Sequence, residues 1–332
     1  MLRGLAALRD PGETLLGGGR TGASAMLAAE LSGRPSFCHV LDAYHEAQVR
    51  RSLIENRFEE KVRLACSPFP PEQLFDTVVY IAADGDVSGE LCVEQIDSFA
   101  KRLKPGGVFL LGTDCQVGPL AKQLKQTVGN AAVEKGLLRA VKTVAETKSR
   151  SFAAEFDASL PGQDPVKLMT LPGVFCHRRP DMGGLALAET AVRFLKPGQR
   201  VLDFGCGCGM VGILLAKAVP GTRCVFVDSH ARAVECTRRN LDALGMPDHR
   251  VELSAVGWRD GVVDCFVGNP PYYGDYSIAE LFLDNAQQTV GKGGLVFFVA
   301  KNPRKLHELM SIRFGDIEEI PRRGYTVLKA TV

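Results

Sequence analysis

Residues 269–272 read Asn-Pro-Pro-Tyr, and these residue types suit chemistry on a flat amino group. An amine conjugated to a ring or a carbonyl is a poor nucleophile, because its lone pair is delocalised. The side-chain oxygen of Asn269 and the backbone carbonyl of Pro270 offer acceptors for its N–H groups, which would draw the nitrogen towards tetrahedral geometry. Tyr272 can stack on a planar substrate. The tetrapeptide therefore predicts transfer to a planar nitrogen, without a strong general base, since the product sheds its proton readily.

A second motif lies at residues 203–209, which read Asp-Phe-Gly-Cys-Gly-Cys-Gly. Glycines let the backbone approach a ligand closely, and a helix amino terminus behind them offers N–H groups. Met210 stands where a dinucleotide-binding turn needs its third glycine, so the spacing favours S-adenosylmethionine over NAD. Asp203 is placed to orient backbone groups or to meet the cofactor's ammonium, and Asp228 to accept both ribose hydroxyls. The alternative is a tight strand-to-helix connection without a ligand.

Both motifs follow apolar segments that read as strands, at residues 200–204 and 262–267. The first strand runs into the glycine turn and a helix over residues 211–219. The second cannot continue past Asn269, because the prolines that follow supply no N–H to a strand ladder. Parallel α/β sheets bind ligands at the carboxyl ends of their strands, so we expect the two motifs to lie close together.

Alternating strand and helix patterns run through both halves of the chain, which predicts doubly wound, mostly parallel sheets. The halves look like copies, because residues 102–112 resemble residues 290–300 and Asp42 falls opposite Asp228 at nearly the same offset. The first half lacks an acidic residue ahead of its glycines and has no counterpart of Asn269. We therefore expect the chemistry in the second half, and a linker at residues 159–165.

The composition is that of an ordinary globular protein, with 45% hydrophobic residues and a net charge of +2 that neither requires nor excludes a nucleic-acid partner. No apolar run approaches the roughly 20 residues of a membrane helix, and Arg9 interrupts the N-terminus before a signal-peptide core. Ten cysteines without a Cys-x-x-Cys pair suggest neither a zinc site nor disulfides. We expect a cytoplasmic protein with no metal and no membrane partner.

With these motifs the second half looks like a class I S-adenosylmethionine-dependent methyltransferase, and the whole chain resembles the RsmC/RlmG-like ribosomal RNA guanine-N2 methyltransferase family. The family's catalytic domain opens with Leu-Pro-Gly-Val-Phe, matched by residues 171–175, and then a D-x-G-[ST] helix start, matched by residues 181–184 with Gly184 in place of the hydroxyl. The resemblance implies an α/β fold of two Rossmann-like domains in tandem. Residues 1–158 would be a degenerate structural or RNA-binding copy, and residues 159–332 the catalytic domain. The implied partner of this monomer is ribosomal RNA or a ribosomal subunit.

The resemblance also implies the members of the site. The cofactor would contact Asp203, Gly205, Cys206, Gly207, Asp228, Ser229, Ser254, Ala255 and Asn269. The guanine would meet the catalytic residues Asn269, Pro270 and Tyr272, with Phe175, Pro271, Tyr272 and Tyr273 as substrate contacts. Ala255 departs from the family's Asn or Asp, which removes a side-chain contact to adenine. Tyr273 departs from the family's histidine, which bears on substrate choice.

Two other functions stay open. The same tetrapeptide serves on other planar nitrogens, such as adenine N6 or a protein glutamine amide. The other is a non-catalytic RNA-binding or assembly protein with an inactive remnant of the active site, although the intact Asp203, Asp228 and Asn269 argue against this. The arginine pairs at 178–179, 238–239 and 322–323 read as solvated surface pairs, with phosphate contact as the alternative, and residues 135–150 as a basic surface.

Overall fold

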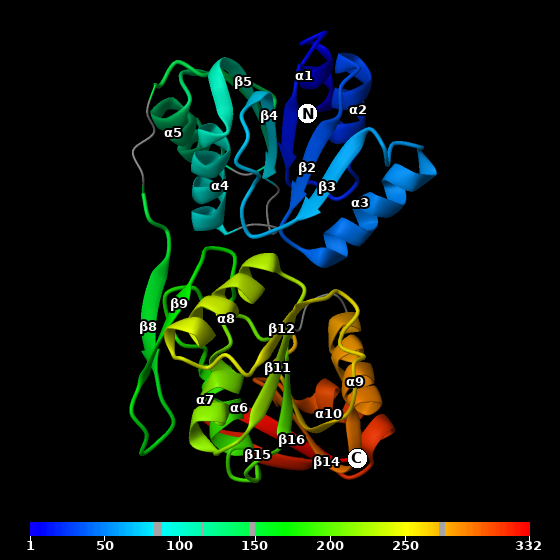
Figure 1. Cartoon of the computed structure of the whole chain (residues 1–332), viewed down its shortest axis with the longest axis vertical. Helices are drawn as coiled ribbons and strands as arrows, with labels where there is room; N and C mark the ends of the chain where they lie inside the picture. Colours follow the sequence, from blue (N-terminus) through cyan, green and yellow to red (C-terminus); the bar gives the residue numbers. More distant parts are fainter. Residues whose placement is uncertain (83–87, 115, 146–149, 272–275) are drawn as a thin grey trace. The chain divides into compact units, whose positions relative to one another are not determined.

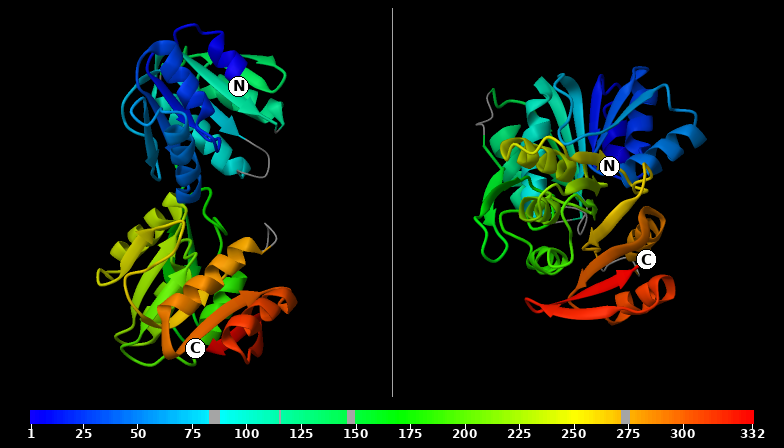
Figure 2. Two further views of the ribbon diagram at one scale, coloured as in Figure 1. Left: turned by 90° about the vertical axis from the view of Figure 1, so that its right-hand side faces the viewer. Right: turned by 60° about the horizontal axis from the view of Figure 1, so that its bottom comes forward.

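The computed structural model describes residues 1–82, 88–114, 116–145, 150–271 and 276–332. The chain divides into two compact units, Met1–Phe152 and Ala153–Val332. Each unit is a sheet with helices on both faces, as Figure 1 and Figure 2 show. The boundary expected at residue 158 lies beyond this division, because residues 154–158 pair with a strand of the second unit.

The first unit contains a mixed sheet with the strand order β3-β2-β1-β4-β5-β7-β6. Its strands are β1 (Thr14–Gly17), β2 (Ser36–Val40), β3 (Val62–Cys66), β4 (Phe75–Ala82), β5 (Leu103–Thr113), β6 (Ala131–Glu134) and β7 (Leu137–Val141). Its helices are α1 (Leu2–Ala6), α2 (Ala23–Ser32), α3 (Ala43–Glu55), α4 (Gly89–Lys101) and α5 (Val117–Thr127). The strands from β3 to β5 in this order are parallel, and β7 and β6 join antiparallel.

Two apolar cores lie on opposite faces of this sheet because β1 is buried on both sides. Leu15 packs into a core with α4 and α5, whereas Leu16 packs into a core with α1, α2 and α3. Successive side chains of a strand point to opposite faces, so a strand between two helical layers must be apolar throughout. This explains the uninterrupted apolar runs from which the strands were predicted.

The second unit repeats this arrangement, with the strand order β12-β11-β10-β13-β14-β16-β15. Its strands are β10 (Arg200–Phe204), β11 (Arg223–Asp228), β12 (Arg250–Leu253), β13 (Val263–Gly268), β14 (Val290–Ala300), β15 (Glu318–Arg322) and β16 (Tyr325–Thr331). Its helices are α6 (Met182–Ala191), α7 (Met210–Ala218), α8 (Ala231–Ala243), α9 (Ser277–Thr289) and α10 (Arg304–Phe314). One core lies under α6, α7 and α8, and the other under α9 and α10.

A hairpin of β8 (Ala154–Ala158) and β9 (Val166–Thr170) precedes this sheet. Residues 159–165 connect its antiparallel strands, so the expectation that they form the linker is wrong. Their proline and glycine make a turn in either setting, and only the pairing of Ala158 with Val166 distinguishes a hairpin from a linker. The side chain of Asn240 in α8 bonds the backbone of Met169 in β9, which attaches the hairpin to the second unit.

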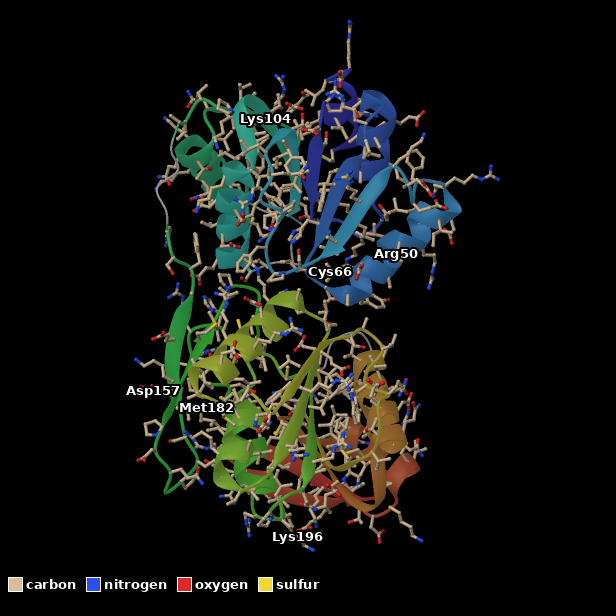
Figure 3. All side chains as sticks on the ribbon, viewed as in Figure 1. Arg50, Cys66, Lys104, Asp157, Met182 and Lys196 are labelled. Carbon is tan, nitrogen blue, oxygen red and sulfur yellow. The ribbon has the colours of Figure 1, made fainter. Side chains whose placement is uncertain are left out.

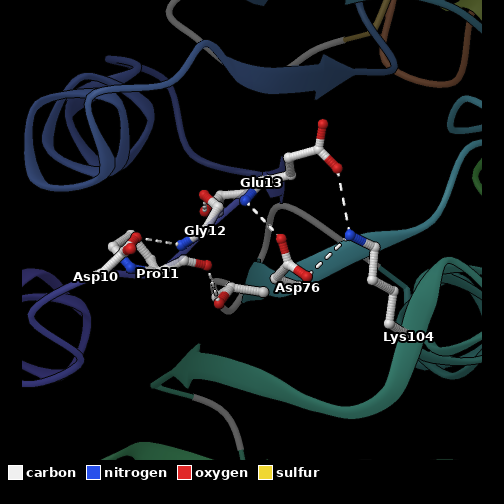
Figure 4. Close-up of polar contacts among 8 residues, drawn as sticks. Asp10, Pro11, Gly12, Glu13, Asp76 and Lys104 are labelled. Carbon is white, nitrogen blue, oxygen red and sulfur yellow. Dashed lines mark hydrogen bonds and ion pairs between the residues drawn. The ribbon is translucent and has the colours of Figure 1, made fainter.

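Equivalent carboxylates fix the register of the two copies. Asp76 Oδ2 accepts the N–H of Glu13 at 2.9 Å, and Asp76 Oδ1 accepts Lys104 Nζ at 2.8 Å, as Figure 4 shows. In the second copy Asp264 Oδ2 accepts the N–H of Arg200 at 2.7 Å. Asp76 therefore corresponds to Asp264, and Glu13 to Arg200.

Counting along the paired strands from this anchor gives the counterparts of the predicted site residues. Leu16 stands where the second copy has Asp203, and Val40 where it has Asp228. The expectation that Asp42 lies opposite Asp228 is therefore wrong. Asp42 is instead the N-cap of α3, where its Oδ1 accepts the N–H of Tyr44 at 2.7 Å. The first copy thus lacks an acidic side chain at the end of its second strand.

Candidate active site

The glycine loop joins β10 to α7 at the carboxyl edge of the second sheet. Gly205, Gly207 and Gly209 have φ angles of +72°, +57° and +83°. A Cβ at Gly205 would lie 2.7 Å from the ring of Phe282, whereas no atom lies within 4 Å of a Cβ at Gly207. Gly205 is thus required by packing as well as by its conformation. Gly207 leaves open space beside the backbone, where a ligand can approach.

Side chains of α8 form hydrogen bonds with the backbone of this loop. Thr237 Oγ1 donates to the carbonyl of Gly207 at 3.0 Å. Asn240 Nδ2 donates to the carbonyls of Cys208 and Met169, while its Oδ1 accepts the N–H of Met169 at 2.7 Å. Both side chains are almost fully buried. The sequence analysis did not single them out, although polar residues at i and i+3 on the apolar stripe of a helix are a usable signal.

Asp203 lies in β10 directly before the glycine loop and is only 3% exposed. Its Oδ2 accepts the N–H of Gly212 at 2.8 Å, so the carboxylate orients the first turn of α7. Burial raises the pKa of the Asp203 carboxyl to about 7, the Gly212 N–H lowers it in part, and the charge of Asp228 raises it further. A cation bound nearby would favour the ionised form of Asp203.

Asp228 lies at the end of β11, next in the sheet to β10. Its Oδ2 accepts the N–H of Gly207 at 2.9 Å and its Oδ1 accepts the N–H of His230 at 2.9 Å. Asp228 thereby ties the glycine loop to the start of α8, with Ser229 between them. The predicted contacts to ribose hydroxyls would add to these bonds, since a carboxylate oxygen can accept more than one hydrogen bond.

Ser254 follows β12 and lies at the same edge of the sheet. Its N–H donates to the carbonyl of Asp228 at 3.0 Å. Its Oγ donates to the carbonyl of Gly257 at 2.7 Å and accepts the N–H of Gly257 at 3.0 Å. The hydroxyl is thus used within its own turn, while the half-buried Ala255 follows at the rim. Cys206 is buried in the glycine loop.

Asn269 follows β13, on the other side of β10 from β11. Its side chain is half-buried, and its Nδ2 donates to Asp181 Oδ2 at 2.7 Å. Pro270 is buried and Pro271 is half-buried. The predictions for Tyr272 and Tyr273 fall outside the described residues. The structure thus brings Asn269 to the same edge as Asp203 and Asp228, as the strand ends predict.

The segment between β9 and α6 lies against Asn269. A Cβ at Gly183, in the first turn of α6, would be 3.4 Å from Asn269 Nδ2. Within this segment Phe175 is 71% exposed, and the neighbouring Met182, labelled in Figure 3, is 43% exposed. The fully buried Arg232 of α8 anchors the segment by donating from Nη1 to the carbonyl of Pro172 at 3.0 Å. Phe175 thus has the exposure that its predicted role as a substrate contact requires.

The arginine pairs are engaged within the fold to different degrees. Arg323 donates from Nε and Nη2 to Glu189 Oε1 at 2.8 and 2.6 Å, and Glu189 lies buried in α6. Arg239 pairs with Glu235 one helical turn away at 2.7 Å, and Arg238 donates to the carbonyl of Val251 at 3.3 Å. These contacts use part of the hydrogen-bonding capacity of the guanidinium groups.

The carboxylates and the open space at the glycine loop fit S-adenosylmethionine. Its sulfonium and ammonium groups are cationic, and the carboxylates of Asp203 and Asp228 lie at the glycine loop with open space at Gly207. Among the residues that the structure describes, no group of three or more His, Cys, Asp or Glu side chains is placed to bind a metal ion. No helix in these ranges is long and apolar enough to cross a bilayer.

Comparisons with known proteins agree with this geometry. The family model described as "Methyltransferase small domain" matches residues 165–329. Ribosomal RNA small subunit methyltransferase C of Pseudomonas aeruginosa (strain UCBPP-PA14) is 30% identical over 267 residues, which cover 74% of this chain and 79% of that relative. The protein of the same name from Pseudomonas entomophila (strain L48) is 28% identical over 85% of this chain and 86% of its own length.

The chain belongs to the ribosomal RNA small subunit methyltransferase C family. This membership confirms the predicted family and the predicted class of enzyme. A solved structure of the T. thermophilus 16S rRNA methyltransferase RsmC, in complex with AdoMet and guanosine, superposes with a TM-score of 0.79 at 21% identity. The superposition covers 96% of this chain and 88% of that one, which confirms the predicted fold of tandem Rossmann-like domains.

Proposed function

We propose that the second unit of this chain transfers a methyl group from S-adenosylmethionine to the exocyclic N2 of a guanine in small-subunit ribosomal RNA. The observation that carries the proposal is the edge of the second sheet, where Asn269 after β13 and Asp228 at the end of β11 flank the strand that leads into the glycine loop. The name of the relatives specifies small-subunit ribosomal RNA, and the solved T. thermophilus protein is a 16S rRNA N2 G1207 methyltransferase in complex with AdoMet and guanosine.

The cofactor would be held by the glycine loop and the ends of β11 and β12. Gly205, Gly207 and Asp203 would receive the amino-acid part, Asp228 the ribose, and the Ser254 turn the adenine. S-adenosylmethionine supplies an electrophilic methyl on a positively charged sulfur. The negative charges of Asp203 and Asp228 would stabilise that positive charge. Hydrogen bonds from α8 keep the loop in place before the ligand binds.

Asn269 would grip the guanine amino group. Its Nδ2 is used by Asp181, which leaves the amide oxygen as the acceptor for an N–H of the substrate. The carbonyl of Pro270 is the expected second acceptor, and the rigid proline backbone fixes both oxygens. Phe175 and Pro271, with Tyr272 and Tyr273, would contact the flat face of the base. Asn269 thus orients the lone pair of the attacking nitrogen rather than removing a proton.

The first unit is proposed to stabilise the enzyme or to bind RNA. Leu16, Val40 and Ile81 stand at the positions of Asp203, Asp228 and Asn269, so this copy lacks the acceptors that a cationic cofactor requires. The basic residues at 135–150, of which 146–149 lie outside the described residues, are a proposed RNA contact. We further propose a cytoplasmic monomer.

Methyl transfer from tritiated S-adenosylmethionine to purified ribosomal fractions tests this function. The expected product is N2-methylguanosine in small-subunit RNA, identified by nucleoside digestion and mass spectrometry. Label in adenine N6 or in a protein glutamine would support the rival use of the tetrapeptide. Calorimetry without saturable S-adenosylmethionine binding would support a non-catalytic RNA-binding protein. Naked RNA and assembled subunits, assayed side by side, identify the form of the substrate.

A further inference from the structure

Asn269 has an amide whose two ends are nearly equal in size and opposite in hydrogen-bonding character. Only its oxygen can accept an N–H of an amine, whereas its nitrogen would present two N–H donors to the same group. The side chain must therefore keep one of two orientations for the proposed grip on guanine to work. The structure places Asp181 Oδ2 at 2.7 Å from Asn269 Nδ2. An ionised carboxylate only accepts hydrogen bonds, so it can pair only with the nitrogen end of this amide.

Asp181 is itself fixed by the start of α6. It is the N-cap of this helix, where Oδ1 accepts the N–H of Gly183 at 3.1 Å and Oδ2 accepts the N–H of Gly184 at 2.7 Å. A carboxylate that caps a helix in this way has little freedom to rotate. Its Oδ2 therefore presents a fixed acceptor to Asn269, even though the two residues are 88 positions apart in the chain.

Gly184 avoids a close contact beside the Asp181 carboxylate. A Cβ on Gly184 would lie 3.0 Å from Asp181 Oδ2 and 2.9 Å from the Cε of Met210. A Cβ on Gly183 would lie 3.4 Å from Asn269 Nδ2, which is an ordinary contact distance. Gly184 stands where the resembling family has serine or threonine.

We propose that Asp181 is a positioning residue that sets the orientation of the Asn269 amide, so that the amide oxygen faces the amine being methylated. This inference rests on the proposed function of Asn269. Asp181 acts through Asn269 and does not touch the substrate. Its carboxylate also disfavours the inverted amide, in which two oxygen atoms would face each other without a proton between them.

Asp181→Asn tests the orientation with little change in size or capping ability. An asparagine at position 181 has one oxygen for the three N–H groups that the two carboxylate oxygens of Asp181 accept, so its NH2 would face either Gly183 or Asn269. In molecules whose NH2 faces Asn269, the Asn269 amide would turn its oxygen towards residue 181 and its NH2 towards the substrate. We expect kcat for methyl transfer to fall by about 2- to 10-fold, because only part of the molecules would keep the orientation that a hydrogen bond to a charged group selects. The affinity for S-adenosylmethionine, measured by calorimetry, should stay within about twofold.

A reciprocal exchange separates positioning from a merely structural role. In Asn269→Asp two carboxylates face each other. In the double variant Asp181→Asn/Asn269→Asp, the amide introduced at position 181 can donate to the carboxylate introduced at position 269 and leave an oxygen of that carboxylate for the substrate. We therefore expect the double variant to have a higher kcat than Asn269→Asp. If Asp181→Asn changes kcat by the same factor in both backgrounds, the proposal is overturned.

Two measurements complete the test. Asp42→Asn, which changes the N-cap aspartate of α3 in the first unit, is the matched control and should leave kcat unchanged. The side-chain NH2 resonances of Asn269, assigned by NMR, should shift in Asp181→Asn but not in Asp42→Asn. This readout needs no substrate, so unchanged resonances overturn the positioning role whatever the protein methylates. If the wild type forms no N2-methylguanosine, the proposed function fails separately, and the resonances still decide the orientation.

Discussion

Replacing Asp203 by asparagine should change how S-adenosylmethionine binding depends on pH. Asp203 is 3% exposed, and its burial raises the pKa of its carboxyl to about 7. A cationic ligand stabilises the ionised carboxylate, so binding should release a proton and become tighter as the pH rises through 7. Asp203→Asn keeps an oxygen for the Gly212 N–H but cannot ionise.

The expected magnitude follows from the titration. With a pKa near 7, roughly 10% of Asp203 is ionised at pH 6 and roughly 90% at pH 8. If the ionised form binds the cofactor, Kd at pH 6 should be roughly tenfold higher than at pH 8. Isothermal titration calorimetry of both proteins over this range measures the effect. The amino group of the ligand titrates equally in both experiments, so the difference between the two profiles isolates Asp203.

Stability provides an independent readout of the same group. The pKa of Asp203 is raised on folding, so its contribution to the free energy of unfolding is fully present below its unfolded value of 3.8 and is lost as the pH rises towards 7. The total loss is at most about 4 kcal/mol, since each pKa unit corresponds to about 1.4 kcal/mol. The melting temperature of Asp203→Asn, relative to that of the wild type, should therefore increase between pH 4 and pH 7. If Kd and the melting temperature depend on pH in the same way for the wild type and for Asp203→Asn, this reasoning is refuted.

Three further substitutions test separate parts of the site. Asn269→Ala should lower kcat by about 10²- to 10³-fold while the calorimetric Kd for S-adenosylmethionine stays nearly constant, because the lost contact acts in the transition state. A loss of cofactor affinity as large as the loss of kcat would contradict the assigned role. Asp228→Ala should raise that Kd at least about tenfold, with a smaller effect on kcat at saturating cofactor, because it removes the tie to Gly207 as well as the ribose acceptor. Arg323→Ala should lower the unfolding free energy, measured in urea, by about 2 kcal/mol, because it leaves the Glu189 carboxylate buried without this partner. The control Arg304→Ala removes a 94% exposed side chain and should leave the unfolding free energy unchanged. Unchanged urea stability of Arg323→Ala would show that its pair with Glu189 contributes little.

The strands and the glycine loop could be predicted because they depend on short-range patterns, and the duplication because similar residues recur at a nearly constant offset. Apolar runs that end in glycine or in Asn269 mark the carboxyl ends of β10 and β13, and the rules for parallel sheets place those ends together. The same reasoning identified Asp228 at the end of β11. These features are local, since a few consecutive residues determine each of them.

The remaining features depend on contacts between distant segments. Nothing in the sequence around Asn269 indicates which end of its amide faces the substrate; Asp181, 88 positions away, decides this. The pairing of Ala158 with Val166 forms a hairpin where a linker was expected. Strand pairing makes Val40, not Asp42, the residue of the first copy that is equivalent to Asp228. The sequence by itself determined which chemical groups reach the edge of the second sheet, because strand ends are encoded locally. Only the tertiary structure decided how those groups are oriented and which partners they have, because hydrogen bonds between distant residues depend on distances and directions that exist only in the folded chain.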